Sequence, residues 1–154
     1  MLHFVNYNIT FQEVPDEVSL CFNISNCQIR CPGCHSKYLW DDVGENFLDN
    51  IENIVTRYSN YITCVCFMGG THDMSSLECA ANIVKKFKLK VCLYTGEEES
   101  DKFKDILKLL DYIKFGPYID EFGGLDKKTT NQRFYKIENC QLIDKTYLFQ
   151  KEKV

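Results

Sequence analysis

The sequence contains no apolar run that approaches the ~18 residues of a membrane-spanning helix. Its first residues, MLHFVNYNITFQEVPDE, lack the basic segment, apolar stretch and small-residue cleavage site of a secretory signal. Repeats, low-complexity tracts and linkers are also missing. These absences predict a cytoplasmic protein without a membrane partner.

An excess of positive charge is missing too. The chain has 18 Lys and Arg against 22 Asp and Glu, a net charge of −4, so it offers no field that would attract a phosphate backbone. We therefore expect no nucleic-acid partner. With 154 residues, of which 45% are hydrophobic, the chain is long enough for one domain with a real core, and we expect a single domain over residues 1–154.

Cysteine, by contrast, is abundant. Nine cysteines form an odd set, and a reducing cytosol disfavours a disulfide framework, so metal binding or packing must explain them. Six lie in or beside apolar segments and are expected to pack as small hydrophobic residues. These six are Cys21, Cys64, Cys66, Cys79, Cys92 and Cys140.

Hydrophobic periodicity predicts strands that alternate with helices. Residues 17–25, 61–68, 89–94 and 111–115 have the pattern of strands. Residues 46–58 and 103–110 have helical spacing, and a further helix is expected to begin at a capping box formed by Ser75 and Glu78. This order indicates an α/β fold with a mainly parallel sheet, either open or a partial barrel.

The unusual residues follow the predicted strands. CQIRCPGCH follows the first strand, GGTHD the second, TGEEE the third and FGPY the fourth. Because the carboxyl ends of parallel strands meet at one edge of a sheet, we expect four loops to form a single site.

Three cysteines in the first of these loops are spaced Cys-x3-Cys-x2-Cys. Thiolates are soft ligands that suit zinc or iron–sulfur clusters, so Cys27, Cys31 and Cys34 are the candidate metal ligands. Pro32 and Gly33 suit a tight turn between the last two. Either His35 completes a Cys3His zinc site, or the fourth position is left open for a small molecule.

The loop resembles the signature of the radical S-adenosylmethionine (SAM) enzymes. The similarity extends through CNISNCQIRCPGCHSKYLW, FMGG, LYTG and GPYIDEFGGLDKKTTNQRFYKI, which resemble, in that order, the family of anaerobic ribonucleoside-triphosphate reductase activating proteins. This resemblance implies a partial, laterally open (β/α) barrel. It also implies a [4Fe–4S] cluster on Cys27, Cys31 and Cys34, with SAM on the fourth iron.

The activity implied by the resemblance is that of a radical SAM oxidoreductase, a glycyl-radical activating enzyme. Cleavage of SAM would give a 5′-deoxyadenosyl radical, which abstracts hydrogen from a glycine of the reductase large subunit. A low-potential donor such as flavodoxin or ferredoxin would supply the electron. No catalytic side chain beyond the cluster ligands is implied.

SAM contacts are implied at eight positions. The glycine pair lets backbone approach the methionyl end, a threonine replaces the usual acidic residue after it, and a histidine replaces the usual tyrosine after the third cysteine. The residues are Gly33, Cys34, His35, Gly69, Gly70, Thr71, Thr95 and Lys114. The polar loop 116–132, with Asn131 and Arg133 at its end, is expected to lie near the protein substrate.

Two other functions remain open. One is a different small radical SAM enzyme that acts on a metabolite or a peptide. The other is a non-catalytic zinc or iron–sulfur module.

Overall fold

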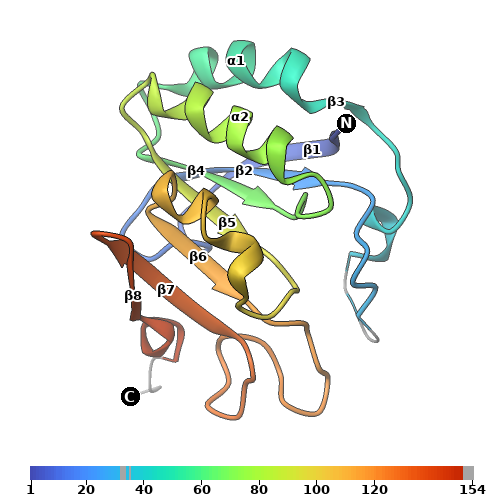
Figure 1. Cartoon of the computed structure of the whole chain (residues 1–154), viewed down its shortest axis with the longest axis vertical. Coiled ribbons are helices and arrows are strands. Elements are labelled where there is room, and N and C mark those ends of the chain that lie inside the picture. Colours follow the sequence, from blue (N-terminus) through green and yellow to red (C-terminus); the bar gives the residue numbers. More distant parts are fainter. Residues whose placement is uncertain (32–33, 35, 151–154) are drawn as a thin grey trace.

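A computed structural model describes residues 1–31, 34 and 36–150 and shows a single sheet beneath two helices (Figure 1). In this described part of the chain the sheet has eight strands in the order β3-β1-β2-β4-β5-β6-β7-β8. Its four central strands are parallel to one another. They are β2 (Ser19–Ile24), β4 (Cys64–Met68), β5 (Lys90–Tyr94) and β6 (Tyr112–Phe115).

The parallel centre is the predicted α/β core, and antiparallel strands extend it at both edges. The strands β1 (His3–Thr10) and β3 (Glu45–Asn46) lie beyond β2, while β7 (Arg133–Glu138) and β8 (Gln141–Asp144) lie beyond β6. The sheet remains open, which confirms the predicted fold class of a partial barrel. The sequence did not predict β1, β3 or β8, because these edge strands are largely exposed and carry little hydrophobic alternation.

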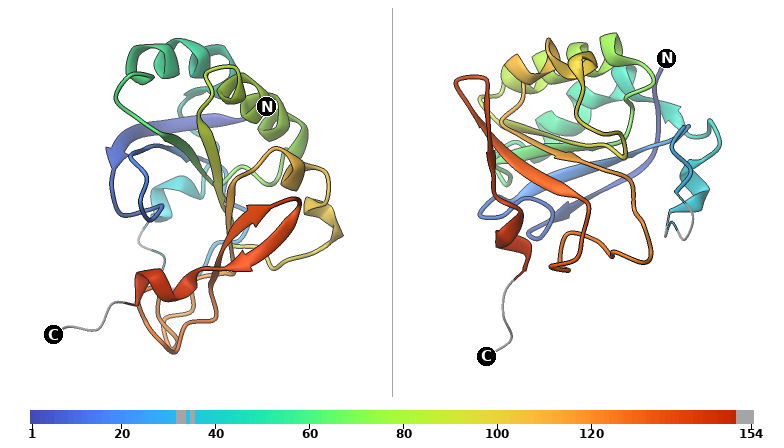
Figure 2. Two further views of the ribbon diagram at one scale, coloured as in Figure 1. Left: turned by 90° about the vertical axis from the view of Figure 1, so that its left-hand side faces the viewer. Right: turned by 60° about the horizontal axis from the view of Figure 1, so that its bottom comes forward.

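Both helices cover the same face of the sheet (Figure 2). They are α1 (Phe47–Tyr58) and α2 (Met74–Lys85). Alternate residues of the central strands point into the core beneath them: Leu20, Phe22, Ile24, Val65, Phe67, Val91 and Leu93. This two-residue period separates the helix-covered core from the opposite face of the sheet. Because the four central strands are parallel, the loops after their carboxyl ends lie at one edge.

The opposite face carries a row of buried cysteines. Cys21 lies beside Cys66, and Cys66 beside Cys92, on adjacent parallel strands. Together with Cys64 they pack with Tyr112 and Phe134, as expected for small hydrophobic residues. For Cys79 and Cys140 the prediction was wrong, since both are exposed.

The segment before β6 differs from its prediction. Instead of one helix over residues 103–110 it forms two 3-10 turns, η2 (Asp101–Phe103) and η3 (Ile106–Lys108). Phe103, Ile106 and Leu110 are buried all the same. Two short turns thus bury the apolar stripe that the sequence assigned to a helix.

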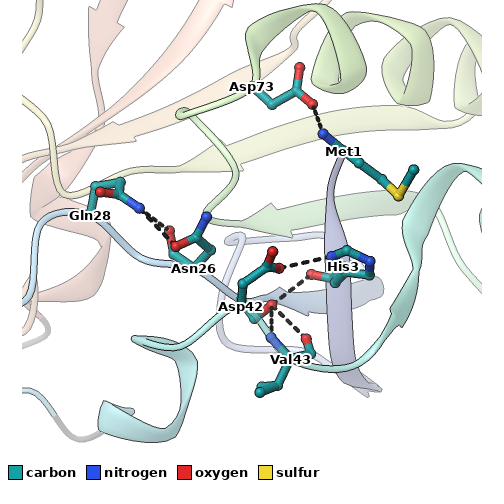
Figure 3. Close-up of polar contacts among 8 residues, drawn as sticks. Met1, His3, Asn26, Gln28, Asp42, Val43 and Asp73 are labelled. Atoms are coloured by element: carbon teal, nitrogen blue, oxygen red, sulfur yellow. Dashed lines mark hydrogen bonds and ion pairs between the residues drawn. The ribbon is translucent and has the colours of Figure 1, made fainter.

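The cap of α2 also differs. The helix begins at Met74, and the side chain of Asp73 accepts a hydrogen bond from the backbone N–H of Ser76 (3.2 Å) and from its hydroxyl (2.7 Å). Asp73 also contacts the amino nitrogen of Met1 at 2.8 Å (Figure 3). The expected capping box at Ser75 and Glu78 was therefore placed two residues late.

Replacing Asp73 with alanine is expected to lower the free energy of unfolding by about 1–2 kcal/mol, because α2 loses its N-cap. Urea unfolding of the protein without cofactors measures this. Ser75→Ala is the control and should cost under about 0.5 kcal/mol, since Ser75 is exposed. Equal losses in the two variants would contradict the assigned cap.

Among the described residues, no helix combines the length and apolar composition that a membrane crossing requires.

Candidate functional site: a three-thiolate loop at the sheet edge

The loops that follow the four parallel strands lie side by side at one edge of the sheet. Backbone bonds continue the ladder beyond the strands: Gly69 N donates to Tyr94 O (3.0 Å), and Thr95 N donates to Lys114 O (2.9 Å). Gly116 N then donates to Glu97 O (2.9 Å). The predicted convergence of the loops is therefore present.

The cysteine loop is closed at its base by backbone hydrogen bonds. Asn26 N donates to Asp41 O (3.1 Å), and Cys27 N donates to Leu39 O (2.9 Å). Gln28 Nε2 donates to Asn26 Oδ1 at 2.8 Å (Figure 3). These contacts hold Cys27, the first of the predicted ligands, shortly after the end of β2.

The far end of the cysteine loop is tied to β1. His3 Nδ1 lies 2.8 Å from Asp42 Oδ1 (Figure 3). The hydroxyl of Ser25 donates to Val43 O (2.6 Å) and accepts from Val43 N (3.1 Å). The unpredicted edge strand thus anchors the segment that leaves the candidate metal site.

Two of the three cysteine sulfurs accept backbone hydrogen bonds. Ser36 N donates to Cys34 Sγ, and Tyr118 N donates to Cys31 Sγ, both at 3.3 Å. Cys31 is buried, whereas Cys27 and Cys34 are partly exposed. Amide donors directed at thiolate sulfur are one of the features that tune iron–sulfur centres.

The two metal hypotheses differ in how closely the ligands converge. Four thiolates or imidazoles around one zinc ion lie roughly 4 Å apart, because each Zn–S bond is about 2.3 Å. In a cluster, each thiolate binds its own iron, so a wider spread is required. Three soft ligands in one loop and two amide donors to their sulfurs fit the chemistry of a [4Fe–4S] cluster. The fourth ligand of the Cys3His zinc alternative, His35, lies outside the described residues.

A cavity of about 130 Å³ lies beside Cys27. It gathers residues from three of the four loops, and five of the predicted site residues border it: Cys27, Gly69, Gly70, Thr71 and Thr95. Gln28, Ile29, His72, Gly96, Glu97 and Lys102 complete its lining. The cavity thus brings Cys27, a predicted metal ligand, together with the glycine pair, where the resemblance implies contact with SAM.

Backbone conformation and packing also explain why glycine occupies positions 69 and 70. Gly69 and Gly70 have φ values of 110° and 96°, which side-chain-bearing residues rarely adopt. A Cβ on Gly70 would lie 3.0 Å from Leu77 Cδ2 and 3.4 Å from Ile24 Cδ1. The missing side chain of Gly70 therefore faces the core, while its backbone borders the cavity.

The other predicted SAM contacts are distributed differently. Thr95 is buried, and its hydroxyl accepts from Glu97 N at 3.0 Å. Lys114 is not among the residues that line the cavity. Gly33 and His35 lie outside the described residues. A direct contact of Thr95 or Lys114 with SAM stays a prediction.

Three residues at this edge were not assigned to the site from the sequence. Glu97 and Lys102 form an ion pair of 2.8 Å at the cavity wall, and Tyr118 donates to Cys31. The sequence did contain a signal for Glu97, because this residue belongs to the TGEEE segment that follows a predicted strand. Nothing in the sequence signals the backbone donor of Tyr118, since its role depends on how the chain folds back.

The fold and the site define an α/β protein that carries three cysteines in one loop at the carboxyl edge of its parallel strands. Comparison with protein families agrees: the model described as "4Fe-4S single cluster domain" matches residues 17–143, so the chain belongs to this family. It is a 4Fe-4S cluster domain of the radical SAM activase type. No curated protein matches the chain.

Proposed function

We propose that this protein is a radical SAM activase that generates a glycyl radical on the large subunit of an anaerobic ribonucleoside-triphosphate reductase. The observation that carries the proposal is the cavity shared by Cys27 and the Gly69–Gly70 turn, in a domain of the activase-type cluster family. The sequence similarity to reductase activating proteins, from Cys21 to Ile137, supports the choice of substrate.

In this proposal Cys27, Cys31 and Cys34 hold the cluster. When bound, the cluster and SAM supply a one-electron reductive cleavage of the sulfonium. The backbone at Gly69 and Gly70 borders the place where SAM would lie, and the hydroxyl of Thr71 replaces an acidic contact. A low-potential protein such as flavodoxin or ferredoxin supplies the electron.

The open sheet favours a protein substrate. A closed barrel would enclose its substrate, whereas this sheet ends in the short strands β3 and β8 and does not close. The loop over residues 116–132 continues from β6 at the site edge and leads into β7. A glycine-bearing loop of the reductase could therefore approach the site from the side.

The test is anaerobic reconstitution with iron and sulfide, followed by incubation with SAM, a reductant and the reductase from the same genome. A glycyl radical signal in the reductase, with formation of 5′-deoxyadenosine, is the expected result. SAM cleavage without a radical in the reductase would instead assign another radical SAM activity. A colourless protein that does not bind SAM would instead indicate a zinc module.

A further inference from the structure

Lys114 is a buried cation at the end of β6. Its ammonium donates to Thr95 O and Gly116 O, both at 3.0 Å, and lies 5.7 Å from the centre of the Tyr94 ring. The residue is buried, with 8% of its surface exposed. An ammonium in such a place is costly unless polar groups and negative charge compensate it.

The pKa of Lys114 reflects both this burial and the nearby cysteines. Burial lowers the pKa of Lys114 to about 8, and Cys31 and Cys27, followed by Cys66 and Cys92, act against that shift. Cys31 and Cys27 come first among these cysteines. These are two of the three proposed cluster ligands. Hydrogen bonds also link the lysine to this loop, since Lys114 Nζ binds Gly116 O and Tyr118, two residues further on, donates to Cys31 Sγ, so the negative charge of a thiolate-bound cluster would be its counter-charge.

The same lysine belongs to a clamp on the segment Gly116–Tyr118. Gly116 O accepts from both Lys114 Nζ and Gln132 Nε2 (3.4 Å), and Pro117 O accepts from Asn131 Nδ2 (3.0 Å). Gln132 is itself buried. Side chains from β6 and from the residues before β7 therefore fix two consecutive backbone carbonyls, directly before Tyr118.

The turn itself accepts only glycine. Gly116 has a φ of 106°, and a Cβ there would lie 3.2 Å from the Cα of Gln132. The next residue but one, Tyr118, donates its N–H to Cys31 Sγ. The clamp thus ends on a proposed cluster ligand.

From this geometry we infer that Lys114, Asn131 and Gln132 are positioning residues that raise the reduction potential of the cluster. They hold the Tyr118 N–H against the Cys31 sulfur, and Lys114 adds a buried positive charge nearby. Hydrogen bonds to sulfur and nearby positive charge both favour the reduced cluster, which carries one more electron. The inference rests on the cluster of the proposed function.

The inference gives Asn131 a different role from its predicted place near the protein substrate. Its amide nitrogen is engaged with Pro117 O, whereas the neighbouring Arg133 is exposed. In this role Asn131 acts on the cysteine loop indirectly, by holding Pro117 next to Tyr118, whose N–H donates to Cys31.

The test is a redox titration of the reconstituted cluster in Lys114→Met, Gln132→Met and Asn131→Ala. All three variants are expected to have a midpoint potential more negative than that of the wild type, with the largest shift in Lys114→Met. Lys136→Met is the control, because it removes the same charge from the exposed side chain of β7. Its potential should not change.

Iron content and thermal unfolding of each variant accompany the titration, because a merely structural role would change these without moving the potential. If Lys114→Met does not fold, the midpoint potentials of Gln132→Met and Asn131→Ala test the inference. Unchanged potentials in variants that load a full cluster would overturn the inference. A wild-type protein that loads no cluster would contradict both proposals, whereas a loaded protein that cleaves no SAM would contradict only the proposed function.

Discussion

Cys31→Ala is expected to abolish the [4Fe–4S] absorption and SAM cleavage together. Cys31 is the buried member of the triplet and the sulfur that Tyr118 N–H contacts, so its loss removes one of three protein ligands at the least solvated position. Two remaining thiolates leave two irons without protein ligands. Iron and sulfide analysis, the visible spectrum and 5′-deoxyadenosine yield measure the result, and we expect cluster occupancy to fall at least about tenfold.

Cys79→Ala is the matched control, since Cys79 is exposed on α2 and far along the chain from the cysteine loop. It should retain the full cluster. A normal spectrum in Cys31→Ala, or loss of the spectrum in Cys79→Ala, would show that the ligands have been assigned wrongly.

Gly70→Val is expected to lower the free energy of unfolding by about 2–4 kcal/mol, through backbone strain and overpacking. A φ of 96° is unfavourable for a β-branched residue, and its Cβ would already lie 3.0 Å from Leu77 Cδ2. The turn would have to shift, and with it the cavity wall beside Cys27. Urea unfolding of the protein without cofactors measures the loss, and SAM binding to the reconstituted protein measures its effect on the site.

Gly124→Ala is the control for this change. Gly124 has no positive φ, and the nearest atom to its Cβ position is 3.6 Å away. It should change stability by less than about 1 kcal/mol. Equal stability in Gly70→Val and Gly124→Ala would contradict the packing described at the glycine pair.

The sequence was sufficient for the parallel core because its signals are local. Buried strands such as β4 and β5 are continuous apolar runs, and α1 has a clear stripe that includes Phe47, Ile51 and Val55. Once the order of strands and helices is known, chain topology places the following loops at one edge. The convergence of Cys27 with Gly69 and Thr95 follows from that rule.

The parts that the sequence did not predict depend on contacts between distant segments. The strand β1 is defined by pairing with β2 and β3 rather than by its own pattern, with Phe4 buried and most of its other side chains exposed. Likewise, the cap of α2 uses Asp73, which the sequence placed in a ligand loop. Tertiary pairing decides such positions, and local propensity does not.

The roles of glycine and lysine show the same limit. A glycine pair after a strand indicates a close approach or a turn, but only the fold shows that the absent Cβ of Gly70 faces Leu77 and Ile24. The sequence placed Lys114 at the site edge without its hydrogen-bond partners. Its contact with Thr95 O arises from the register between β5 and β6, and its contact with Gly116 O from the turn that follows β6.

The most direct test of the central claim, a three-thiolate cluster whose fourth iron is open to SAM, is an electron paramagnetic resonance titration of the reduced, reconstituted protein with SAM. The account predicts a [4Fe–4S]⁺ signal in the protein alone. Addition of SAM should change the g-values of this signal until the site is saturated, whereas adenosine, which lacks the methionyl group, should leave them unchanged. A reduced cluster whose spectrum is unaffected by excess SAM would contradict it.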